Sequence, residues 1–490
     1  MAEIHYGCLM DLVQIEKFDE VYIKVKAEPS VMMEMSEYFT FMVPGAKFMP
    51  AYRSKFWDGK IRLLNVMTGL LYAGLTKYVE EFCKSRDYEI EYLTDFSSEN
   101  FSIKEANDFI AKLKPTMQPR DYQIDAFVHA VRERRALLLS PTASGKSFII
   151  YLLVRYYAKR TLIIVPTTSL VSQLASDFAD YGFDSDTFVH RVFAGQDKGS
   201  TKPITISTWQ SVYKLPKEFF DQFDVVIGDE AHLFKAKSLT SILTKLSGCR
   251  YRFGFTGTLD GTETHRLVLE GLFGAVRKVI TTKELIDQKH LADFRIKAIV
   301  LNHPDEAKKM IARANDYQAE MDYIVKLEAR NKFIKNLALS LEGNTLILYQ
   351  FVEKHGIHLA NMLQNNDRSV YWVSGEVSGE QREEIRKVVE KESNAIIVAS
   401  FGTFSTGVNI KNLHNIIFAS PSKSRIRNLQ SIGRGLRKSN TKTSSTLYDI
   451  ADNLSWKTKK NYTLLHFMER VKIYNEEKFE YKIYKVNLEN

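Results

Sequence analysis

The sequence predicts an α/β protein built on two tandem doubly wound parallel sheets. Apolar runs of strand length alternate with helical segments from about residue 120 to about residue 285, and a second alternating series begins near Phe294. This alternation is typical of βαβ units, in which successive strands pair in parallel. Pro115 and Pro119 separate the first series from an N-terminal segment, where short strands and one helical stretch favour a small α+β module.

These breaks divide the chain into four expected parts. At 490 residues it is too long for one ordinary hydrophobic core. The four parts are an N-terminal α+β domain over 1–112, a first α/β domain over 113–292, a second over 293–455, and a C-terminal extension over 456–490. We expect the second α/β domain to contain strands at 345–348, 369–373, 395–399 and 415–419. The extension should pack on that domain as a helix, because apolar residues recur there at helical spacing, namely Leu464, Leu465, Met468 and Val471.

Composition and charge argue against a membrane protein and a disulfide-rich protein, and favour a protein that binds a polyanion. No apolar stretch is long enough to cross a membrane, and the first residues lack the layout of a signal peptide. The three cysteines lie far apart without a Cys/His cluster, which indicates neither a disulfide framework nor a zinc site and fits a reducing cytoplasm. The net charge of +9 favours a polyanionic partner. The cations cluster near the N-terminus and again late in the chain, at Lys47, Arg53, Lys55, Lys60, Arg62, Lys423, Arg425, Arg427, Arg434, Arg437, Lys438 and Lys442.

A phosphate-binding loop is expected between the strand-like run 136–139 and the helical run 148–154. It reads Ser-Pro-Thr-Ala-Ser-Gly-Lys-Ser from Ser140 to Ser147, with Ser140 in place of the usual first glycine. Backbone N–H groups of such a loop, with the positive end of the following helix, cradle nucleotide phosphates. Lys146 would reach the outer phosphates, and the Ser147 hydroxyl would bind Mg²⁺. The loop contributes Thr142, Ser144, Gly145, Lys146 and Ser147 as cofactor-binding candidates.

Two carboxylates follow a second buried strand. Residues 223–228 run into Asp229 and Glu230, at the strand end where doubly wound sheets bind ligands. Asp229 would hold Mg²⁺, and Glu230 would orient and deprotonate the water that attacks the phosphate. The alternative is a solvated acidic turn, which the order of the two motifs disfavours.

Other strand ends carry polar groups for the same edge. Gln123 has an amide donor and acceptor suited to adenine, although its tetrapeptide also reads as a helix start. Hydroxyls and an amide suited to phosphate contacts follow two strands, at Thr167, Thr168, Thr208 and Gln210. Trp209 either stacks on a base or packs beneath its loop. Beside the acidic pair, His232, Thr256 and Thr258 are candidates for coupling the nucleotide site to the bound nucleic acid.

The order of these motifs resembles the motor of superfamily 2 helicases. Residues 399–409 look like the fifth motif of that family, and residues 430–437 like the sixth. The resemblance implies two RecA-like domains that hydrolyse ATP with Mg²⁺ and pull on nucleic acid. It also implies catalytic roles for Gln430, Arg434 and Arg437, nucleotide contacts from Gly407 and Asn409, and nucleic-acid contacts from Ser400 and Thr403. Arg434 and Arg437 are three apart, so on a helix both project from one face; a solvated basic face is the alternative. Asn409 stands where many relatives have an Asp.

A closer resemblance covers nearly the whole chain, to the UvsW-type recombination helicases of phages. Residues 48–64 are similar to the accessory domain of that family. The resemblance implies action on stalled forks, Holliday junctions and R-loops in recombination, replication and repair, by a monomer that can meet single-strand-binding or recombination proteins. In the sequence itself, Asp58-Gly59 predicts a hairpin turn. The surrounding side chains form either a DNA-contacting surface or a packed hairpin, and the DNA-contact candidates are Arg53, Lys55, Trp57, Lys60 and Arg62.

Two other functions remain open from the sequence. One is an RNA helicase, because such motors grip the backbone of either nucleic acid. The other is an ATP-switched junction-binding or strand-annealing protein without processive unwinding.

Overall fold

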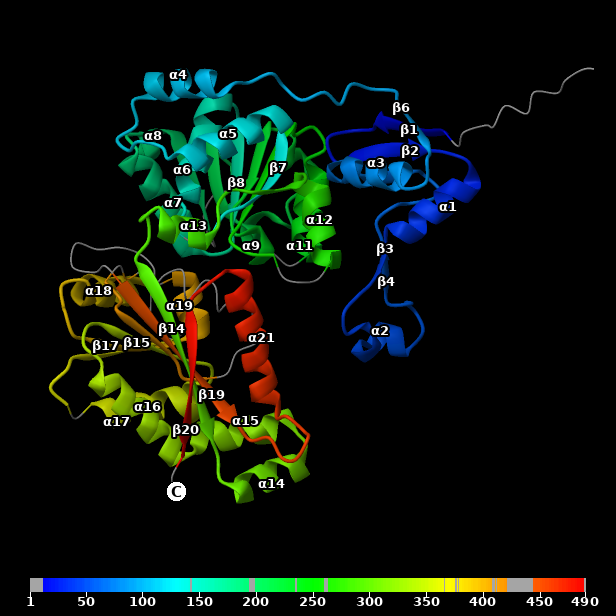
Figure 1. The fold of residues 1–490 in the computed structure, drawn as a ribbon. Helices are drawn as coiled ribbons and strands as arrows, with labels where there is room; N and C mark the ends of the chain where they lie inside the picture. The colour runs from blue at the N-terminus through cyan, green and yellow to red at the C-terminus, as the bar shows by residue number, and fades with distance from the viewer. Residues whose placement is uncertain are drawn as a thin grey trace, which may run out of the picture. The chain divides into compact units, whose positions relative to one another are not determined.

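The structure is a computed structural model that describes residues 12–141, 143–193, 199–233, 236–259, 263–364, 366–374, 377, 379–407, 410, 412–420 and 444–488. The chain divides into two compact units. The first comprises residues 1–140 and 145–279, and the second comprises residues 141–144 and 280–490. Figure 1 shows the arrangement of elements within each unit.

The first unit begins with a small mixed sheet. Its strand order is β5-β2-β1-β6, with β1 antiparallel to β2 and parallel to β6. The strands are β1 (Leu12–Lys17), β2 (Tyr22–Lys26), β5 (Leu70–Tyr72) and β6 (Glu89–Tyr92), and helices α1 (Pro29–Tyr38) and α3 (Thr76–Lys84) complete its core. This sheet is the predicted α+β module.

The predicted hairpin turn at Asp58-Gly59 is wrong. Strands β3 (Thr40–Met42) and β4 (Lys60–Arg62) do pair antiparallel, but residues 43–59 connect them and include η1 (Ala46–Phe48) and α2 (Pro50–Arg53). Gly59 has the positive φ (+78°) that the dipeptide suggested. Its place is the end of a long loop, because an Asp-Gly pair suits many loops besides a two-residue turn.

The small sheet is seated directly on the first parallel-sheet domain. The Tyr78 hydroxyl donates to Glu270 Oε2 at 2.5 Å, and Glu270 is only 2% exposed. Glu270 lies on α12 (Glu263–Phe273), whose Leu267 joins the core of the small sheet. A Cβ added at Gly74 would stand 1.9 Å from the Glu270 carbonyl oxygen, so only glycine permits this backbone approach.

The large sheet of the first unit has seven parallel strands in the order β13-β7-β12-β11-β8-β10-β9. They are β7 (Arg135–Leu139), β8 (Thr161–Val165), β9 (Val189–Val192), β10 (Ile204–Thr208), β11 (Val225–Gly228), β12 (Tyr251–Thr256) and β13 (Val276–Lys278). One face packs against α5 (Asp121–Glu133), α6 (Lys146–Tyr157) and α7 (Thr168–Asp180). The other packs against α9 (Trp209–Val212), α10 (Lys217–Phe220), α11 (Ala236–Lys245) and α12. Remaining helices are α4 (Ile103–Leu113), α8 (Ser185–Phe188) and α13 (Thr282–Asp287).

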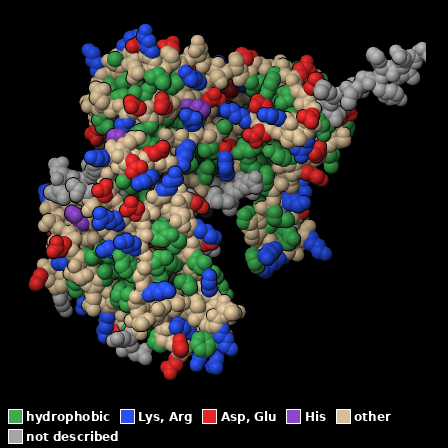
Figure 2. All heavy atoms as spheres, in the orientation of Figure 1, with side chains coloured by type: hydrophobic (Ala, Val, Ile, Leu, Met, Phe, Trp, Pro, Cys, Tyr) green, Lys and Arg blue, Asp and Glu red, His purple; other side chains and the backbone are tan. Residues whose placement is uncertain are grey.

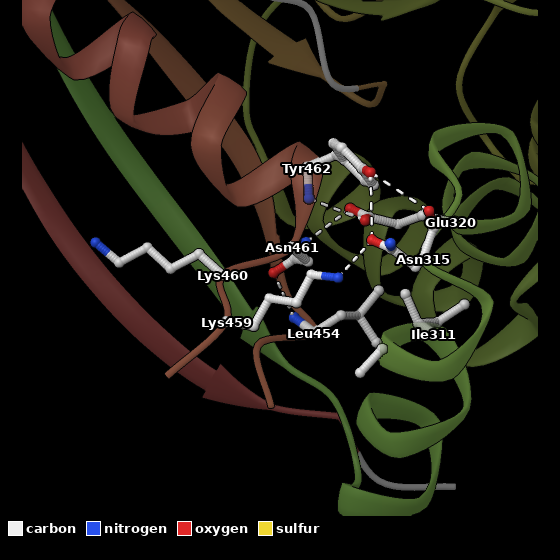
Figure 3. Close-up of a pocket in the computed structure, with 9 residues that line it drawn as sticks. Ile311, Asn315, Glu320, Leu454, Lys459, Lys460, Asn461 and Tyr462 are labelled. Carbon is white, nitrogen blue, oxygen red and sulfur yellow. Dashed lines mark hydrogen bonds between the residues drawn. The ribbon is translucent and has the colours of Figure 1, made fainter. Parts of the chain in front are cut away.

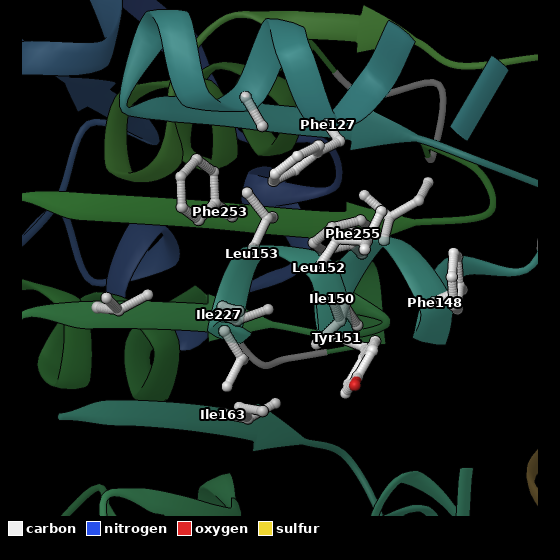
Figure 4. Close-up of a cluster of buried hydrophobic side chains, with 14 of the residues drawn as sticks. Phe127, Phe148, Ile150, Tyr151, Leu152, Leu153, Ile163, Ile227, Phe253 and Phe255 are labelled. Carbon is white, nitrogen blue, oxygen red and sulfur yellow. The ribbon is translucent and has the colours of Figure 1, made fainter. Parts of the chain in front are cut away.

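Side chains of α6 fill the centre of this core. Figure 4 shows Ile150 and Leu153 of α6 lying among Ile163, Ile227 and Phe253 from three neighbouring strands. Helix α6 is apolar nearly all round because it is buried between the sheet and α5 and α7. Since this helix opens at Lys146, its burial also fixes the phosphate loop.

The second unit has another parallel sheet of seven strands, in the order β16-β17-β15-β18-β19-β14-β20. They are β14 (Asp293–Asn302), β15 (Thr345–Tyr349), β16 (Val370–Val373), β17 (Ile396–Ser400), β18 (Asn415–Phe418), β19 (Ser444–Asn453) and β20 (Tyr481–Asn487). Its helices include α14 (Asp305–Ala314), α15 (Tyr317–Lys326), α16 (Glu328–Ser340), α17 (Ile357–Leu363), α18 (Gly379–Val389), α19 (Phe401–Gly407) and α21 (Tyr462–Glu476). The prediction of an α/β fold with two RecA-like sheets and a small N-terminal domain is confirmed.

The C-terminal extension does more than pack as a helix. Leu464 and Val471 of α21 pack against β14 and β19, whereas Leu465 and Met468 face outward. After α21 the chain adds β20 to the sheet edge beside β14, which the sequence did not predict. None of the helices in the described part of the chain has both the length and the apolar character needed to span a membrane.

We predict that Gly74→Ala lowers the free energy of unfolding by about 1–3 kcal/mol, because the new methyl group forces the Glu270 backbone away from the small sheet. Urea unfolding of wild type and variant measures the difference. The matched control is Gly248→Ala, since an added Cβ there meets nothing within 4 Å. Equal losses for both variants would contradict the docking contact.

Candidate nucleotide-binding site

The parallel sheet of the first unit brings the predicted motifs to one edge. The phosphate loop follows β7, Thr256 ends β12, and Asp229 follows β11. Thr167 and Thr208 stand at the ends of β8 and β10. Because β7, β12, β11, β8 and β10 are consecutive neighbours and all parallel, five chain segments far apart in sequence present their ends together.

The predicted phosphate loop has the left-handed backbone turns that a phosphate-binding loop requires. Ser140 N–H donates to the Thr256 carbonyl at 2.8 Å, and Ser140 is fully buried, which explains why a small residue stands there. The Ser144 hydroxyl donates to the Pro141 carbonyl at 2.6 Å. Ala143 and Gly145 have positive φ angles of +68° and +80°, which turn the chain into the start of α6. Thr142 lies outside the described residues.

Lys146 and the acidic pair meet at the head of α6. The Lys146 amine donates to Glu230 Oε1 and lies 3.9 Å from Asp229 Oδ1. Burial raises the pKa of the Asp229 carboxyl, and the neighbouring Lys146 charge opposes that rise. Glu230 holds a positive φ of +51°, and its N–H donates to Asp229 Oδ1 at 2.9 Å. The two carboxylates therefore face the phosphate loop, and the acidic turn is no solvated loop.

The oxygens near the loop suit a magnesium ion. Ser147 Oγ and Asp229 supply a hydroxyl and a carboxylate, and Mg²⁺ at nucleotide sites takes one or two such protein ligands while water and phosphate complete its shell. Ser147 Oγ hydrogen-bonds the Tyr181 hydroxyl at 2.7 Å. Within the described residues, no three His, Cys, Asp or Glu side chains form a metal-binding group by themselves. The residues present thus fit an ion carried in with a nucleotide.

The three candidate coupling residues form one connected chain. Thr256 Oγ1 donates to the Thr258 carbonyl at 2.6 Å, and His232 Nδ1 bonds the same hydroxyl at 2.5 Å. A hydroxyl has one proton, so His232 must be the donor in that bond. His232 Nδ1 also lies 3.6 Å from Glu230 Oε2. This chain links the end of β12 to the carboxylate that contacts Lys146.

Gln123 is buried against the phosphate loop. Its Oε1 accepts from Arg120 N–H at 2.9 Å, and its Nε2 donates to the Gly145 carbonyl at 3.3 Å. The helix-start interpretation is confirmed, because α5 begins at Asp121. Adenine contact by the same amide stays a prediction.

The DNA-contact candidates of the first unit bond or pack against neighbouring residues of the same sheet edge. Thr167 caps α7 by accepting from Leu170 N–H at 3.4 Å, and Thr168 is exposed. Gln210 Nε2 donates to the Pro166 carbonyl at 3.4 Å, which ties the loop after β10 to the loop after β8. Trp209 packs against the core on the face of the sheet covered by α9 to α12, with its ring centre 5.7 Å from that of Tyr213, as the packing interpretation expects. Thr208 Oγ1 bonds Ser211 Oγ at 2.8 Å.

Two DNA-contact candidates of the second unit lie at the start of α19. Ser400 Oγ donates to Thr403 Oγ1 at 2.8 Å at the start of α19, and Gly407 ends that helix. Asn409, Gln430, Arg434 and Arg437 lie outside the described residues. A small pocket of about 20 Å³, with room for about one water molecule, lies between α14, α15 and the start of α21. Figure 3 shows Glu320 there accepting from Asn461 and Tyr462, and no predicted site residue lines it.

The N-terminal candidates lie around α2 and β4. Arg53, Lys55 and Lys60 are exposed. Arg62 pairs with Asp58 at 2.5 Å, and the Trp57 indole donates to the Lys60 carbonyl at 2.9 Å. Sequence reasoning missed Tyr181 beside Ser147, since no local pattern marks a residue that reaches the loop from the far end of α7.

Comparisons with known proteins find three matching family models. They are the type III restriction enzyme res subunit over residues 116–261, the N-terminal domain of DNA helicase UvsW over 12–93, and the helicase conserved C-terminal domain over 328–439.

Proteins similar to this chain over most of its length include DNA helicases and a DNA translocase. The chain is 36% identical to the ATP-dependent DNA helicase uvsW of Enterobacteria phage T4, over 97% of this chain and 100% of that protein. It is 25% identical to the DNA 3'-5' translocase XPB2 of Sulfurisphaera tokodaii, over 66% of this chain and 80% of the relative. The crystal structure of T4 UvsW matches with a TM-score of 0.51 at 33% identity, covering 97% of this chain and 100% of that one. The type ISP restriction-modification enzyme LlaBIII shares the fold, with a TM-score of 0.56 at 15% identity over 84% of this chain and 34% of its own.

We predict that Thr256→Val lowers the free energy of unfolding by about 1–3 kcal/mol, because it removes the hydroxyl that bonds both His232 and the Thr258 carbonyl in a buried setting. Thermal melting compares it with Thr244→Val, whose hydroxyl bonds only the Thr240 carbonyl within α11. Melting temperatures that fall equally would count against the chain of bonds.

Proposed function

Because the chain belongs to the UvsW family of ATP-dependent DNA helicases, we propose that its substrate is branched DNA: stalled forks, Holliday junctions and R-loops met in recombination, replication and repair. The observation that carries this proposal is the small N-terminal domain seated on α12 of the motor, with the exposed cations Arg53, Lys55 and Lys60 beyond it. A domain fixed to the motor can hold one arm of a junction while the motor pulls another. We propose that residues 1–112 play this part, and that the chain works as a monomer.

ATP is held and cleaved at the edge of the first large sheet in this proposal. Lys146 binds the outer phosphates, while Thr142, Ser144, Gly145 and Gln123 complete the nucleotide contacts. Ser147 and Asp229 hold Mg²⁺, which neutralises charge on the phosphates when bound.

The ion pair between Lys146 and Glu230 suggests how water activation follows binding. An arriving γ-phosphate competes with Glu230 for the Lys146 amine. Its arrival frees Glu230 Oε1 to accept a hydrogen bond from the attacking water and then its proton. Hydrolysis would thereby depend on a correctly seated phosphate.

Residues of the second unit complete the proposed cycle. Arg434 and Arg437 supply positive charge to the transferring phosphate, which in such motors contributes about three to five orders of magnitude in rate. Gln430 has a catalytic role in this proposal, and Gly407 and Asn409 contact the nucleotide. The DNA backbone is held by Thr167, Thr168, Thr208, Gln210, Ser400 and Thr403, and Trp209 packs beneath its loop. His232, Thr256 and Thr258 connect the Glu230 carboxylate to these DNA contacts.

Lys146→Ala should reduce the kcat for DNA-stimulated ATP hydrolysis by at least about 10²–10³, because it removes the cation that stabilises the outer phosphates. DNA affinity should change little, since the DNA contacts lie elsewhere. Lys159→Ala, at an exposed lysine just after α6, is the control. A variant with near-normal turnover would sink the site assignment.

Glu230→Gln should bind ATP and DNA but hydrolyse about 10²–10⁴ times more slowly, because an amide of the same shape cannot accept the proton from water. Single-turnover hydrolysis with nucleotide-binding titrations separates the two steps. The control is Glu218→Gln on the exposed side of α10. Normal hydrolysis in Glu230→Gln would refute its role as base.

The substrate proposal is tested by steady-state ATPase activity of wild type without nucleic acid, with single-stranded DNA, with a four-way DNA junction and with matched RNA. Stimulation by the junction beyond single-stranded DNA supports it. Stimulation by RNA alone would point to an RNA helicase, and tight junction binding with strand pairing but no unwinding would point to an ATP-switched annealing protein.

A further inference from the structure

The loop that joins β3 to β4 carries an unusual set of exposed apolar side chains. Phe56 is 91% exposed, Phe48 65%, and Met49 and Tyr52 are also exposed, as is Met42 at the end of β3. Single exposed hydrophobic residues are ordinary on protein surfaces, but a cluster within about fifteen residues marks an interaction site. We call residues 42–62 the tip. In Figure 1 the tip stands as a small lobe around α2, and in Figure 2 hydrophobic and Lys or Arg side chains gather on it.

The tip is held in shape from within. An added Cβ at Gly59 would lie 2.9 to 3.0 Å from Met42 Sδ, Ala46 Cβ and Tyr52 Cδ2, so these groups already close around the glycine. Val43 N–H donates to the Gly59 carbonyl, and Trp57 N–H donates to the Ala51 carbonyl. The Trp57 indole is occupied by the Lys60 carbonyl. Trp57 therefore belongs to the scaffold of the tip, and Phe56 beside it points outward.

The charge of the tip favours a polyanion. Between Thr40 and Arg62 the sequence has five Lys or Arg residues and one acidic residue. That residue, Asp58, is paired with Arg62. The Lys47 amine lies 5.3 Å from the centre of the Phe48 ring, so cation and aromatic ring stand side by side. A basic surface interleaved with exposed rings is the chemistry that binds nucleic acid with unstacked bases.

Fully paired DNA would use only half of this surface. A duplex offers its phosphates to the cations, but its base faces are stacked on one another and closed to Phe56. Unpaired bases, as found where the arms of branched DNA meet, offer both the phosphates and a free π-face.

We propose that the tip binds unpaired bases at DNA branch points, with Phe56 stacking on a base and Phe48 supporting it. The inference rests on the proposed function, because it assumes that the N-terminal domain meets branched DNA. The sequence offers Tyr52, Phe56 and Trp57 as the aromatic residues of this surface, and the proposal assigns the stacking to Phe56.

The experiment measures the dissociation constants of full-length wild type, Phe56→Ala and Phe56→Trp for two probes. One is a DNA fork with 2-aminopurine unpaired at the branch, and the other is a plain duplex of the same length. Stacking on an aromatic side chain predicts a loss of about 5- to 150-fold in fork affinity for Phe56→Ala. Phe56→Trp should restore fork affinity and 2-aminopurine quenching, while duplex affinity and its salt dependence stay as in wild type.

The matched control is Phe18→Ala, an equally simple truncation of a 60% exposed ring elsewhere in the same domain. It should bind both probes as wild type does. Melting temperatures of all variants should agree, because Phe56 supports no packing.

Other outcomes overturn the proposal. Wild-type fork affinity in Phe56→Ala, or an equal loss in Phe18→Ala, removes the stacking contact. A wild-type dimer that Phe56→Ala converts to a monomer in sedimentation assigns the tip to a second copy, and Phe56-dependent binding to anionic vesicles assigns it to lipid. Failure of the proposed function is distinguishable, because it appears as absent junction stimulation of ATPase activity in wild type itself.

Discussion

The parallel pairing of β7, β12 and β11 is the constraint on which the motor depends. Its register aligns Leu139 with Thr256 and Gly228 with Gly254, so the chain leaves all three strands at nearly the same level. Ser140 then bonds the Thr256 carbonyl, and Glu230 bonds Lys146, across that common edge. A slip of one residue in either pairing would reverse the side-chain directions and separate these groups. The relative placement of these groups is therefore set by main-chain hydrogen bonds between the core strands.

A second constraint is a buried arginine that ties β12 to the ends of α11 and α12. Arg252 on β12 is fully buried, and its guanidinium donates to the carbonyls of Leu243, Leu246 and Leu272 at 2.7 to 2.9 Å. A buried cation is costly unless its donors are satisfied, and here helix-end carbonyls of α11 and α12 supply the acceptors. Helix α12 also contacts the small N-terminal domain, through the hydrogen bond between Glu270 and Tyr78. The same helix therefore contacts both β12, which ends at Thr256, and the N-terminal domain.

Most of the fold could be predicted from the sequence because strands buried in a parallel sheet form continuous apolar runs, as at 345–349 and 396–400. The phosphate loop and the acidic pair could be proposed from sequence because their residue patterns are local, and the structure brings them together. Edge strand β20 was missed, since its exposed lysines and tyrosines carry no apolar run. The hairpin was misplaced because Asp-Gly marks a backbone conformation and not the length of a loop. The choice of Phe56 over Trp57 and the contact of Tyr181 with Ser147 could not be predicted, because exposure and a contact across the fold are set by tertiary packing.

The long-range pairing of β14 also bears on how the protein is made. Asn302 at the end of β14 bonds Asn453 and Asn487, which are 151 and 185 positions later in the chain. A ribosome adding about 5–20 residues per second needs on the order of ten seconds or more to deliver those partners. During that interval an apolar strand stands translated but unpaired, while the sheet of the first unit already has all its strands. Synthesis thus passes through a stage at which the first unit is foldable and the second depends on being shielded from other chains.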